Sequence, residues 1–194
     1  MTTSTARRMD EIGDESRRRI LDAAEQLFSE KGFEKTSFVD IAALSGISRG
    51  SIPWHFKNKD GLLLAVVERV NHRYMSLDQM SESPKLEEIL ARYGVLARDF
   101  GGRLMFAVLT EALNTDSVVH EEYKAYHAQH RRRVAHWLKF VGVRSEKTRE
   151  ALATAILGSM IGITLQWQID PEGVDLEASF KGLAKLVDEA VPNG

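Results

Sequence analysis

The sequence predicts an all-α fold of about nine helices. Its 194 residues include only four prolines, and its 14 glycines fall mostly between segments in which apolar residues recur at helical spacing. A chain of this length can bury a substantial core in one or two domains. The sequence has no cysteine, which excludes disulfides and thiolate metal sites and is typical of a reducing, cytoplasmic setting.

The first helix is predicted to begin at about Asp14, after a disordered N-terminal arm. The arm, residues 1–13, lacks the apolar segment of a signal peptide. Apolar residues then recur along one helical face as far as Leu27 and Phe28, and Gly32 is a typical residue for the position after a helix end. This segment therefore predicts one amphipathic helix that packs through a single face.

Two short helices joined by a glycine turn are predicted between residues 36 and 59. Thr36 and Ser37 offer hydroxyls at the first helix start, and Asp40 follows Ser37 at the spacing of a capping box. Gly46 lies where a left-handed residue is expected to end that helix. The turn is therefore predicted to be tight.

The second of these helices separates an inward face from an outward one. Ser48 can cap it, and Ile52 and Phe56 lie one helical turn apart and point inward together. The other side chains have no predicted core role and form an outward face: Arg49, Gly50, Ser51, Trp54 and His55. This arrangement is typical of a helix-turn-helix whose second helix enters the major groove of DNA.

Charge along the chain is compatible with a DNA contact at this segment. The formal net charge is −2, but no carboxylate lies between residues 41 and 59, where Arg49, Lys57 and Lys59 are found. A local basic face is sufficient for phosphate contacts and predicts modest non-specific affinity. The arginines at 17–19 leave two interpretations open, a phosphate contact or a solvated face neutralised by nearby carboxylates.

Residues from Ile20 to about Leu64 resemble the TetR family of transcriptional regulators. The matching segments are ILDAAEQLF, KGFEKTS, DIAALSGIS and RGSIPWHFKNKDGLL, at the family's spacing. The resemblance implies a three-helix DNA-binding domain at 14–60 and a helical ligand-binding and dimerisation domain at 61–194, which the helix at 61–80 links to the first. It also implies a cytoplasmic, homodimeric regulator, commonly a repressor, that binds a palindromic operator in double-stranded DNA and is released by a small hydrophobic ligand.

The predicted DNA contacts follow from the helix-turn-helix and from the resemblance. Arg49 is the expected base reader, because a guanidinium can bind the N7 and O6 edge of guanine. Lys59 corresponds to a phosphate-contacting lysine of the family, and Trp54 has packing against a neighbouring helix as its alternative. The full predicted set is Thr36, Ser37, Ser48, Arg49, Gly50, Ser51, Trp54, His55 and Lys59.

Pro53 departs from the family pattern, which usually has a tyrosine at this position. A proline inside a helix costs on the order of 3 kcal/mol, because it has no N–H and its ring crowds the preceding turn. We therefore expect this helix to begin later, with Ser51 as its cap, or to be kinked or 3₁₀ at its start. The phosphate contact of the family's tyrosine hydroxyl is also lost.

Five further helices are predicted beyond residue 80, and two of them suggest a dimer interface. Small residues recur on one face of the most apolar helix, roughly 146–169, which predicts close approach of a second copy. The alternative is an ordinary intrachain packing face. The predicted interface residues are Ala151, Ala155, Gly158 and Gly162, with Phe180, Leu183 and Val187 of the last helix.

A ligand pocket is predicted from aromatic and methionine side chains with a few polar groups. Its candidate residues are Met105, Phe106, Leu109, Tyr123, Tyr126, His127, Trp137, Met160, Thr164 and Trp167. Three histidines, His120, His127 and His130, lie near Glu121, but no second helix offers a clear ligand pair. We therefore predict no metal site and no cofactor.

Other classes of protein are less well supported by the sequence. It contains no Ser/His/Asp ordering, no phosphate loop, no HExxH and no cysteine nucleophile, so an enzyme is not predicted. No run of about 18 apolar residues occurs, so no membrane span is expected. One alternative remains, a helical ligand-binding or interaction protein whose helix-turn-helix has lost or altered DNA binding, and Pro53 is its support.

Overall fold

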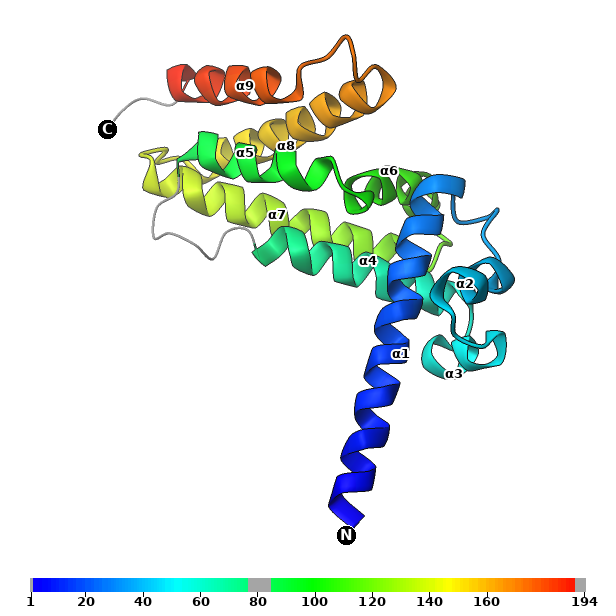
Figure 1. The fold of residues 1–194 in the computed structure, drawn as a ribbon. Coiled ribbons are helices and arrows are strands. Elements are labelled where there is room, and N and C mark those ends of the chain that lie inside the picture. Colours follow the sequence, from blue (N-terminus) through cyan, green and yellow to red (C-terminus); the bar gives the residue numbers. More distant parts are fainter. Residues whose placement is uncertain (1, 77–84, 191–194) are drawn as a thin grey trace. The chain divides into compact units, whose positions relative to one another are not determined.

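The computed structural model describes residues 2–76 and 85–190 (Figure 1). Within these ranges the chain forms nine α-helices and one 3₁₀ helix, with no strand, which confirms the predicted all-α fold. The elements are α1 (Thr2–Lys31), α2 (Phe38–Ser45), η1 (Arg49–Ser51), α3 (Ile52–Phe56), α4 (Lys59–Ser76), α5 (Leu86–Ala97), α6 (Phe100–Leu113), α7 (His120–Phe140), α8 (Glu146–Ile169) and α9 (Leu176–Ala190).

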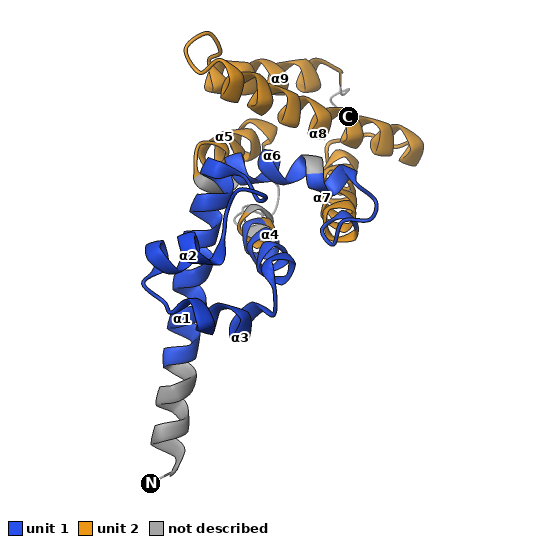
Figure 2. Cartoon of the chain, turned by 90° about the vertical axis from the view of Figure 1, so that its right-hand side faces the viewer, with its two compact units in different colours: residues 1–70, 103–120 blue, residues 71–102, 121–194 orange. Residues whose placement is uncertain are grey.

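The helices form two compact units, and the predicted domains at 14–60 and 61–194 stay a prediction. The first unit comprises residues 1–70 and 103–120, and the second comprises residues 71–102 and 121–194 (Figure 2). Arg69 ties the first part of α4 to α1 through ion pairs of 2.6 Å to Asp22 and 2.5 Å to Glu25. These long-range contacts, which local sequence patterns do not reveal, assign the first part of α4 to the first unit.

The first unit is built on one face of α1. Ile20, Ala24 and Phe28 are fully buried there, and the ring of Phe28 meets that of Phe33 edge-on at 5.4 Å. The helix begins at Thr2, so it continues through residues for which a disordered arm and a start near Asp14 were predicted. No proline interrupts these residues, and a glycine inside a helix costs only about 1 kcal/mol, so local sequence allows the continuation.

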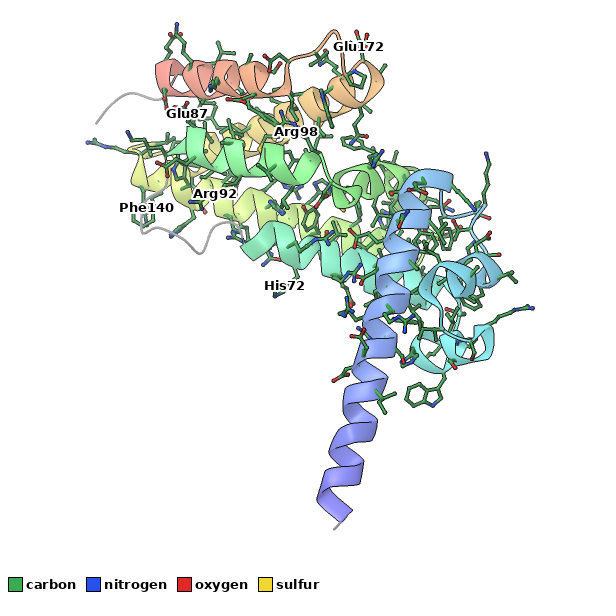
Figure 3. The ribbon with its side chains drawn as sticks, viewed as in Figure 1. His72, Glu87, Arg92, Arg98, Phe140 and Glu172 are labelled. Carbon is green, nitrogen blue, oxygen red and sulfur yellow. The ribbon has the colours of Figure 1, made fainter. Side chains whose placement is uncertain are left out.

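The second unit has its own core, to which α5, α7, α8 and α9 contribute. On α5, Leu86 and Leu90 are buried whereas Glu87 lies at the surface (Figure 3). Phe180 of α9 packs edge-on against the ring of Tyr93 on α5 at 5.8 Å. The core of this unit therefore joins helices from both ends of the segment.

Two residues predicted at a dimer interface, Phe180 and Leu183, belong to this intrachain core. Phe180 and Leu183 are buried in the second unit, and Val187 packs partly buried against the same core. Phe180 and Leu183 thus have packing partners within the chain, where α5 packs against α9, and their place in a dimer interface stays a prediction. The sequence shows that α9 has an apolar face but not which helix covers it.

Helix α8 is apolar and largely uncovered in the single chain. Its length and composition would allow it to cross a membrane, which by itself is weak evidence for a span. In this chain 28% of its most apolar stretch is buried. Its buried residues include Ala153, Ile156 and Met160, which lie in the core of the second unit, as expected for a helix of a bundle. On the opposite side, Ala151 and Ala155 are exposed.

Candidate nucleic-acid interface

Helix α2 is capped at both ends. Asp40 N donates to Ser37 Oγ at 3.2 Å, and Ser37 N donates to Asp40 Oδ2 at 2.9 Å, which confirms the predicted capping box. Hydrogen bonds from the Ser37 side chain and backbone lower the pKa of Asp40 to about 2. Gly46 ends the helix in the left-handed conformation with φ 68°, as predicted. Both caps fix the direction in which the chain enters the next segment.

The recognition segment begins as a 3₁₀ turn and continues as a short α-helix. Ser51 N donates to the Ser48 carbonyl at 3.0 Å, and Ile52 N–H donates to the carbonyl of Arg49. That second bond satisfies the carbonyl that Pro53, which has no N–H, would leave without a partner in a regular α-helix. Pro53 then lies in the first turn of α3, with Ser51 at the N-cap position, where proline is tolerated. The predicted late, 3₁₀ start of this helix is confirmed.

The segment ends in a tight turn at Lys57. Lys57 has φ 65° and ψ −64°, a strained conformation for a residue with a side chain. Lys57 N donates to the Pro53 carbonyl at 2.7 Å, and Asn58 N donates to the Phe56 carbonyl at 2.8 Å. Asn58 Oδ1 then accepts from Gly61 N at 2.7 Å and caps α4. These bonds define the position of the recognition segment between two caps.

The outward surface of this segment consists of Ser48, Arg49, Gly50, Ser51 and Trp54, which we call the reading face. Four of these residues are exposed and Ser51 is half-buried. Trp54 is 78% exposed, so its alternative role as a packing residue is not observed in the structure. On the inner side, Ile52 and Phe56 are buried as predicted.

His55 lies next to Trp54 at the edge of the reading face, and its side chain is half-buried. Its ring meets that of Trp54 edge-on at 4.6 Å. Burial, together with the nearby charge of Arg17, lowers the pKa of His55. His55 is therefore a neutral hydrogen-bonding group at neutral pH rather than a fixed positive charge.

Two cationic side chains near the reading face, Lys59 and Arg17, contact different groups of the chain. Lys59 Nζ donates to the Glu34 carbonyl at 3.1 Å and lies 4.3 Å from the centre of the Phe33 ring. Arg17 lies over the Phe56 ring at 5.1 Å. The Lys59 ammonium group therefore lies beside the loop that precedes α2. It still has N–H donors for a further acceptor.

The other two arginines of the 17–19 run have structural partners. Arg18 pairs with Glu15 at 2.8 Å and with Asp22 at 2.9 Å on the surface of α1. Arg19 Nη2 donates to the Ser45 carbonyl at 2.5 Å and so binds the end of α2 to α1. The solvated, neutralised interpretation holds for Arg18, and Arg19 has a packing role that its position in the sequence did not indicate.

Thr36 does not share the reading face, although it was predicted to contact DNA. It is 1% exposed, and its hydroxyl donates to the Gly32 carbonyl at 2.8 Å. The hydroxyl closes the turn after α1, whereas Ser37 next to it is exposed, and a DNA contact of Thr36 stays a prediction.

The predicted ligand-pocket residues are divided between the two units. Met105, Phe106 and Leu109 lie in the first unit, and the other seven lie in the second. Met160, Trp137 and Trp167 are part of the core of the second unit or pack against it. Thr164 is buried, and its Oγ1 donates to the Met160 carbonyl at 2.9 Å. For these four residues a packing role is therefore established, and ligand contact stays a prediction.

Aromatic rings follow one another along α7 in the second unit. Tyr126 meets His130 at 4.3 Å and His127 at 5.4 Å between ring centres, and Tyr123 meets His127 at 5.0 Å. Burial, with the charges of Arg133 and His127, lowers the pKa of His130 to about 4. Within residues 2–76 and 85–190, no group of three or more histidines and carboxylates is placed to hold a metal ion.

The N-terminal part of the chain is similar to a known family of sequences. Residues 20–66 match the profile of the bacterial regulatory proteins of the tetR family. The transcriptional regulator TtgR of Pseudomonas putida is 40% identical over 77 residues, which are 40% of this chain and 37% of that protein. A transcriptional repressor of Mycobacterium tuberculosis is 40% identical over 104 residues, which are 50% of this chain and 55% of that protein. The matches thus span between about a third and a half of these relatives.

Solved structures resemble the chain over nearly its whole length. The structure of SmeT in complex with triclosan is 25% identical, covers 92% of this chain and 93% of its own, and has a TM-score of 0.75. A transcriptional regulator from Saccharomonospora viridis in complex with choline is 21% identical, covers 90% and 96%, and has a TM-score of 0.76. The second likeness shows the fold alone.

Proposed function

We propose that this chain, which belongs to the TetR family through the domain at 20–66, is a ligand-responsive, DNA-binding transcriptional regulator. In this proposal it is a cytoplasmic repressor that binds a palindromic operator as a homodimer and is released by a small hydrophobic ligand. The observation that carries the proposal is the reading face: an arginine, two serines, a glycine and an exposed tryptophan on a segment with no carboxylate. Such a face has no core role and matches what a DNA groove offers.

Each residue of the reading face has a proposed contact. Arg49 at the start of η1 reads a guanine edge, and Gly50 lets the backbone approach the groove. Trp54 packs on sugar or base surface, and Ser48 and Ser51 donate to phosphates. The 3₁₀ turn lowers support for the alternative that Pro53 has abolished DNA binding, because the proline is accommodated without an unpaired carbonyl at Arg49.

The homodimer is proposed through the uncovered face of α8. Ala151, Ala155, Gly158, Gly162, Leu165 and Ile169 fall within a sector of about 80° when helical residues are placed 100° apart. A Cβ atom added at Gly158 or at Gly162 would meet nothing within 4 Å, and Ile169 is 75% exposed. A second copy of the chain would cover this face, and its symmetry would suit paired operator half-sites.

Ligand responsiveness is proposed for the second unit. Three of its side chains carry buried polar atoms without a hydrogen-bond partner: Asn71 (both amide atoms), His130 (Nε2) and Gln168 (Nε2). Buried polar atoms in native proteins almost always have a partner, so these atoms suggest groups that a ligand or bound water satisfies. The triclosan and choline complexes of the similar structures support a ligand of low molecular weight.

The function is tested by selecting binding sites from random duplex DNA, with the wild-type chain and Arg49→Ala, at two salt concentrations. We expect an enriched inverted repeat whose affinity falls as salt rises. Arg49→Ala should weaken binding by about 1–3 kcal/mol and relax the preference at one position per half-site. The absence of any enriched sequence at either salt concentration would refute the proposed function, and an unchanged preference in Arg49→Ala would refute its reading role.

The dimer is tested by sedimentation of Gly158→Leu. The added side chain has space in the single chain but would block close approach of a second α8, so we expect a monomer that keeps its helical content. Ala125→Leu, on the exposed surface of α7, is the control and should remain dimeric. A dimeric Gly158→Leu would place the interface elsewhere.

A further inference from the structure

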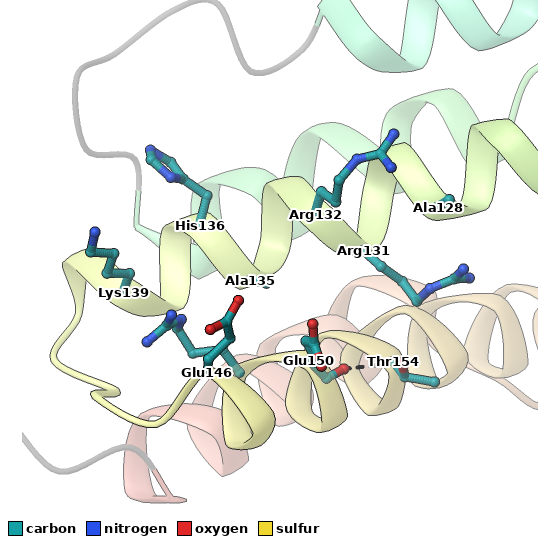
Figure 4. A pocket seen from close by; sticks show the side chains of 10 residues that line it. Ala128, Arg131, Arg132, Ala135, His136, Lys139, Glu146, Glu150 and Thr154 are labelled. Atoms are coloured by element: carbon teal, nitrogen blue, oxygen red, sulfur yellow. Dashed lines mark hydrogen bonds between the residues drawn. The ribbon is translucent and has the colours of Figure 1, made fainter.

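A groove lies between α7 and α8 of the second unit, and no role proposed above uses it. Its volume is about 640 Å³, within the range of small-molecule sites (Figure 4). Ala128 and Ala135 line it from α7, and their short side chains leave space beside α8. Four cationic side chains line the same groove: Arg131, Arg132, Lys139 and Arg149.

Positive charge in this groove is only partly neutralised by the carboxylates that line it. The four cations share the groove with two carboxylates, Glu146 and Glu150, in a chain whose overall formal charge is −2. Over the described parts of the chain, Arg131, Arg132 and Lys139 form no ion pair with any carboxylate within 4.0 Å. Like charges gathered on one helix face repel one another, so an anion in the groove would stabilise the helix pair.

Arg149 is already held in place for such an anion. Its Nη1 donates to the carbonyl oxygens of Val143 at 3.0 Å and Arg144 at 2.6 Å, in the loop that joins α7 to α8. A guanidinium has five N–H donors, so most of them remain for a ligand. Because the side chain is already ordered, binding costs less side-chain entropy than at a free arginine.

We propose that the groove binds a small multivalent anion of the phosphate or polycarboxylate class. Guanidinium groups bind both kinds of oxyanion through paired hydrogen bonds. Glu146 and Glu150 extend from α8 on the side that faces α7, and Arg131 extends from α7 towards α8 (Figure 4). The carboxylates therefore weaken binding by repulsion and restrict the groove to ligands that the cations hold strongly.

Part of the groove lies away from the face of α8 that the proposed dimer would cover. Glu150 and Ala155 are five positions apart, which places them about 140° apart around an α-helix. Glu150 therefore lies on a different side of α8 from Ala155, whereas Thr154, which also lines the groove, lies only about 20° from Leu165 at the edge of the face assigned to the second copy.

The test is calorimetric titration of the full chain with inorganic diphosphate and, separately, with citrate. We expect saturable binding of at least one of them, with one anion per chain; binding of only diphosphate or only citrate identifies the class. Arg132→Gln should weaken binding at least about tenfold, because a hydrogen bond to a charged group is lost. Glu150→Gln should tighten binding, because it removes a repulsive charge.

Lys147→Gln provides the matched control, because Lys147 is an exposed cation on α8 that does not line the groove. It should bind as the wild-type chain does, and circular dichroism should show equal helical content in all variants. Equal weakening in Arg132→Gln and Lys147→Gln, or heat that never saturates with either anion, would overturn the proposal. Weaker binding in Glu150→Gln would overturn it as well. Because the titration contains no DNA, its outcome does not depend on operator binding.

Discussion

The two units differ in how many of their buried side-chain polar atoms lack a hydrogen-bond partner. In the first unit, Glu25 is only 5% exposed, and its carboxylate pairs with Arg69, which also binds Asp22. In the second unit, Asn71, His130 and Gln168 carry buried polar atoms with no partner. Of the described polar atoms in the first unit, Arg69 Nε alone is in that position. A buried polar group destabilises the folded state unless it is hydrogen-bonded, so the unpaired atoms of the second unit are the candidates for the ligand or water contacts proposed above.

The largest expected effect comes from breaking the pair in the first unit. Arg69→Leu leaves the Glu25 carboxylate buried without its cation, so the free energy of unfolding in urea should fall by about 3–5 kcal/mol. The double variant Glu25→Leu with Arg69→Leu should recover much of that loss, because no charge remains buried. Arg18→Leu, which breaks a surface pair, should change little. A small loss in Arg69→Leu would remove the contrast between the units.

The pH dependence of stability should come from the second unit. The pKa of His130 is lowered to about 4 in the folded chain, below its ordinary value, because burial disfavours the imidazolium. The unfolded chain therefore binds more protons between these two values, and stability should fall as pH falls from about 6.5 to 4, by at most about 1.4 kcal/mol per pH unit.

This slope is measured by urea unfolding at several pH values, with His130→Phe as the comparison. The variant keeps an aromatic ring but does not titrate, so its slope should be shallower than that of the wild-type chain. His127 has a pKa lowered by burial and by Arg131, and it should leave a residual slope of the same sign. Identical slopes in the two proteins would show that the pKa of His130 in the folded chain is close to its ordinary value.

The smallest expected effect is a gain in stability. Asn71→Leu replaces a buried amide that has no partner with an apolar side chain of similar size, so the free energy of unfolding should rise by about 1 kcal/mol. Release of DNA by a ligand should weaken in the same variant if the amide serves the ligand. A loss of stability on this substitution would mean that Asn71 has a partner in solution and would erase the contrast at this residue.

The caps of α2 were predictable from the sequence because their causes lie within a few residues. Ser37 with Asp40, and Gly46, each act on backbone groups at most four residues away. The start of α1 at Thr2 was not predicted, because no local signal marks it. The effect of Pro53 was predictable for the same reason, since a missing N–H affects only its own turn. The reading face followed from the spacing of Ile52 and Phe56, which turns the other side chains outward.

Tertiary structure alone decided which partners the exposed and apolar groups found. Thr36 turned inward to the Gly32 carbonyl, Arg19 reached the end of α2, and α5 covered the face of α9 that holds Phe180. The groove between α7 and α8 also depends on how two helices lie side by side. An amphipathic pattern states that a face must be covered, but the identity of the cover depends on residues far away in the chain, and no local propensity encodes it.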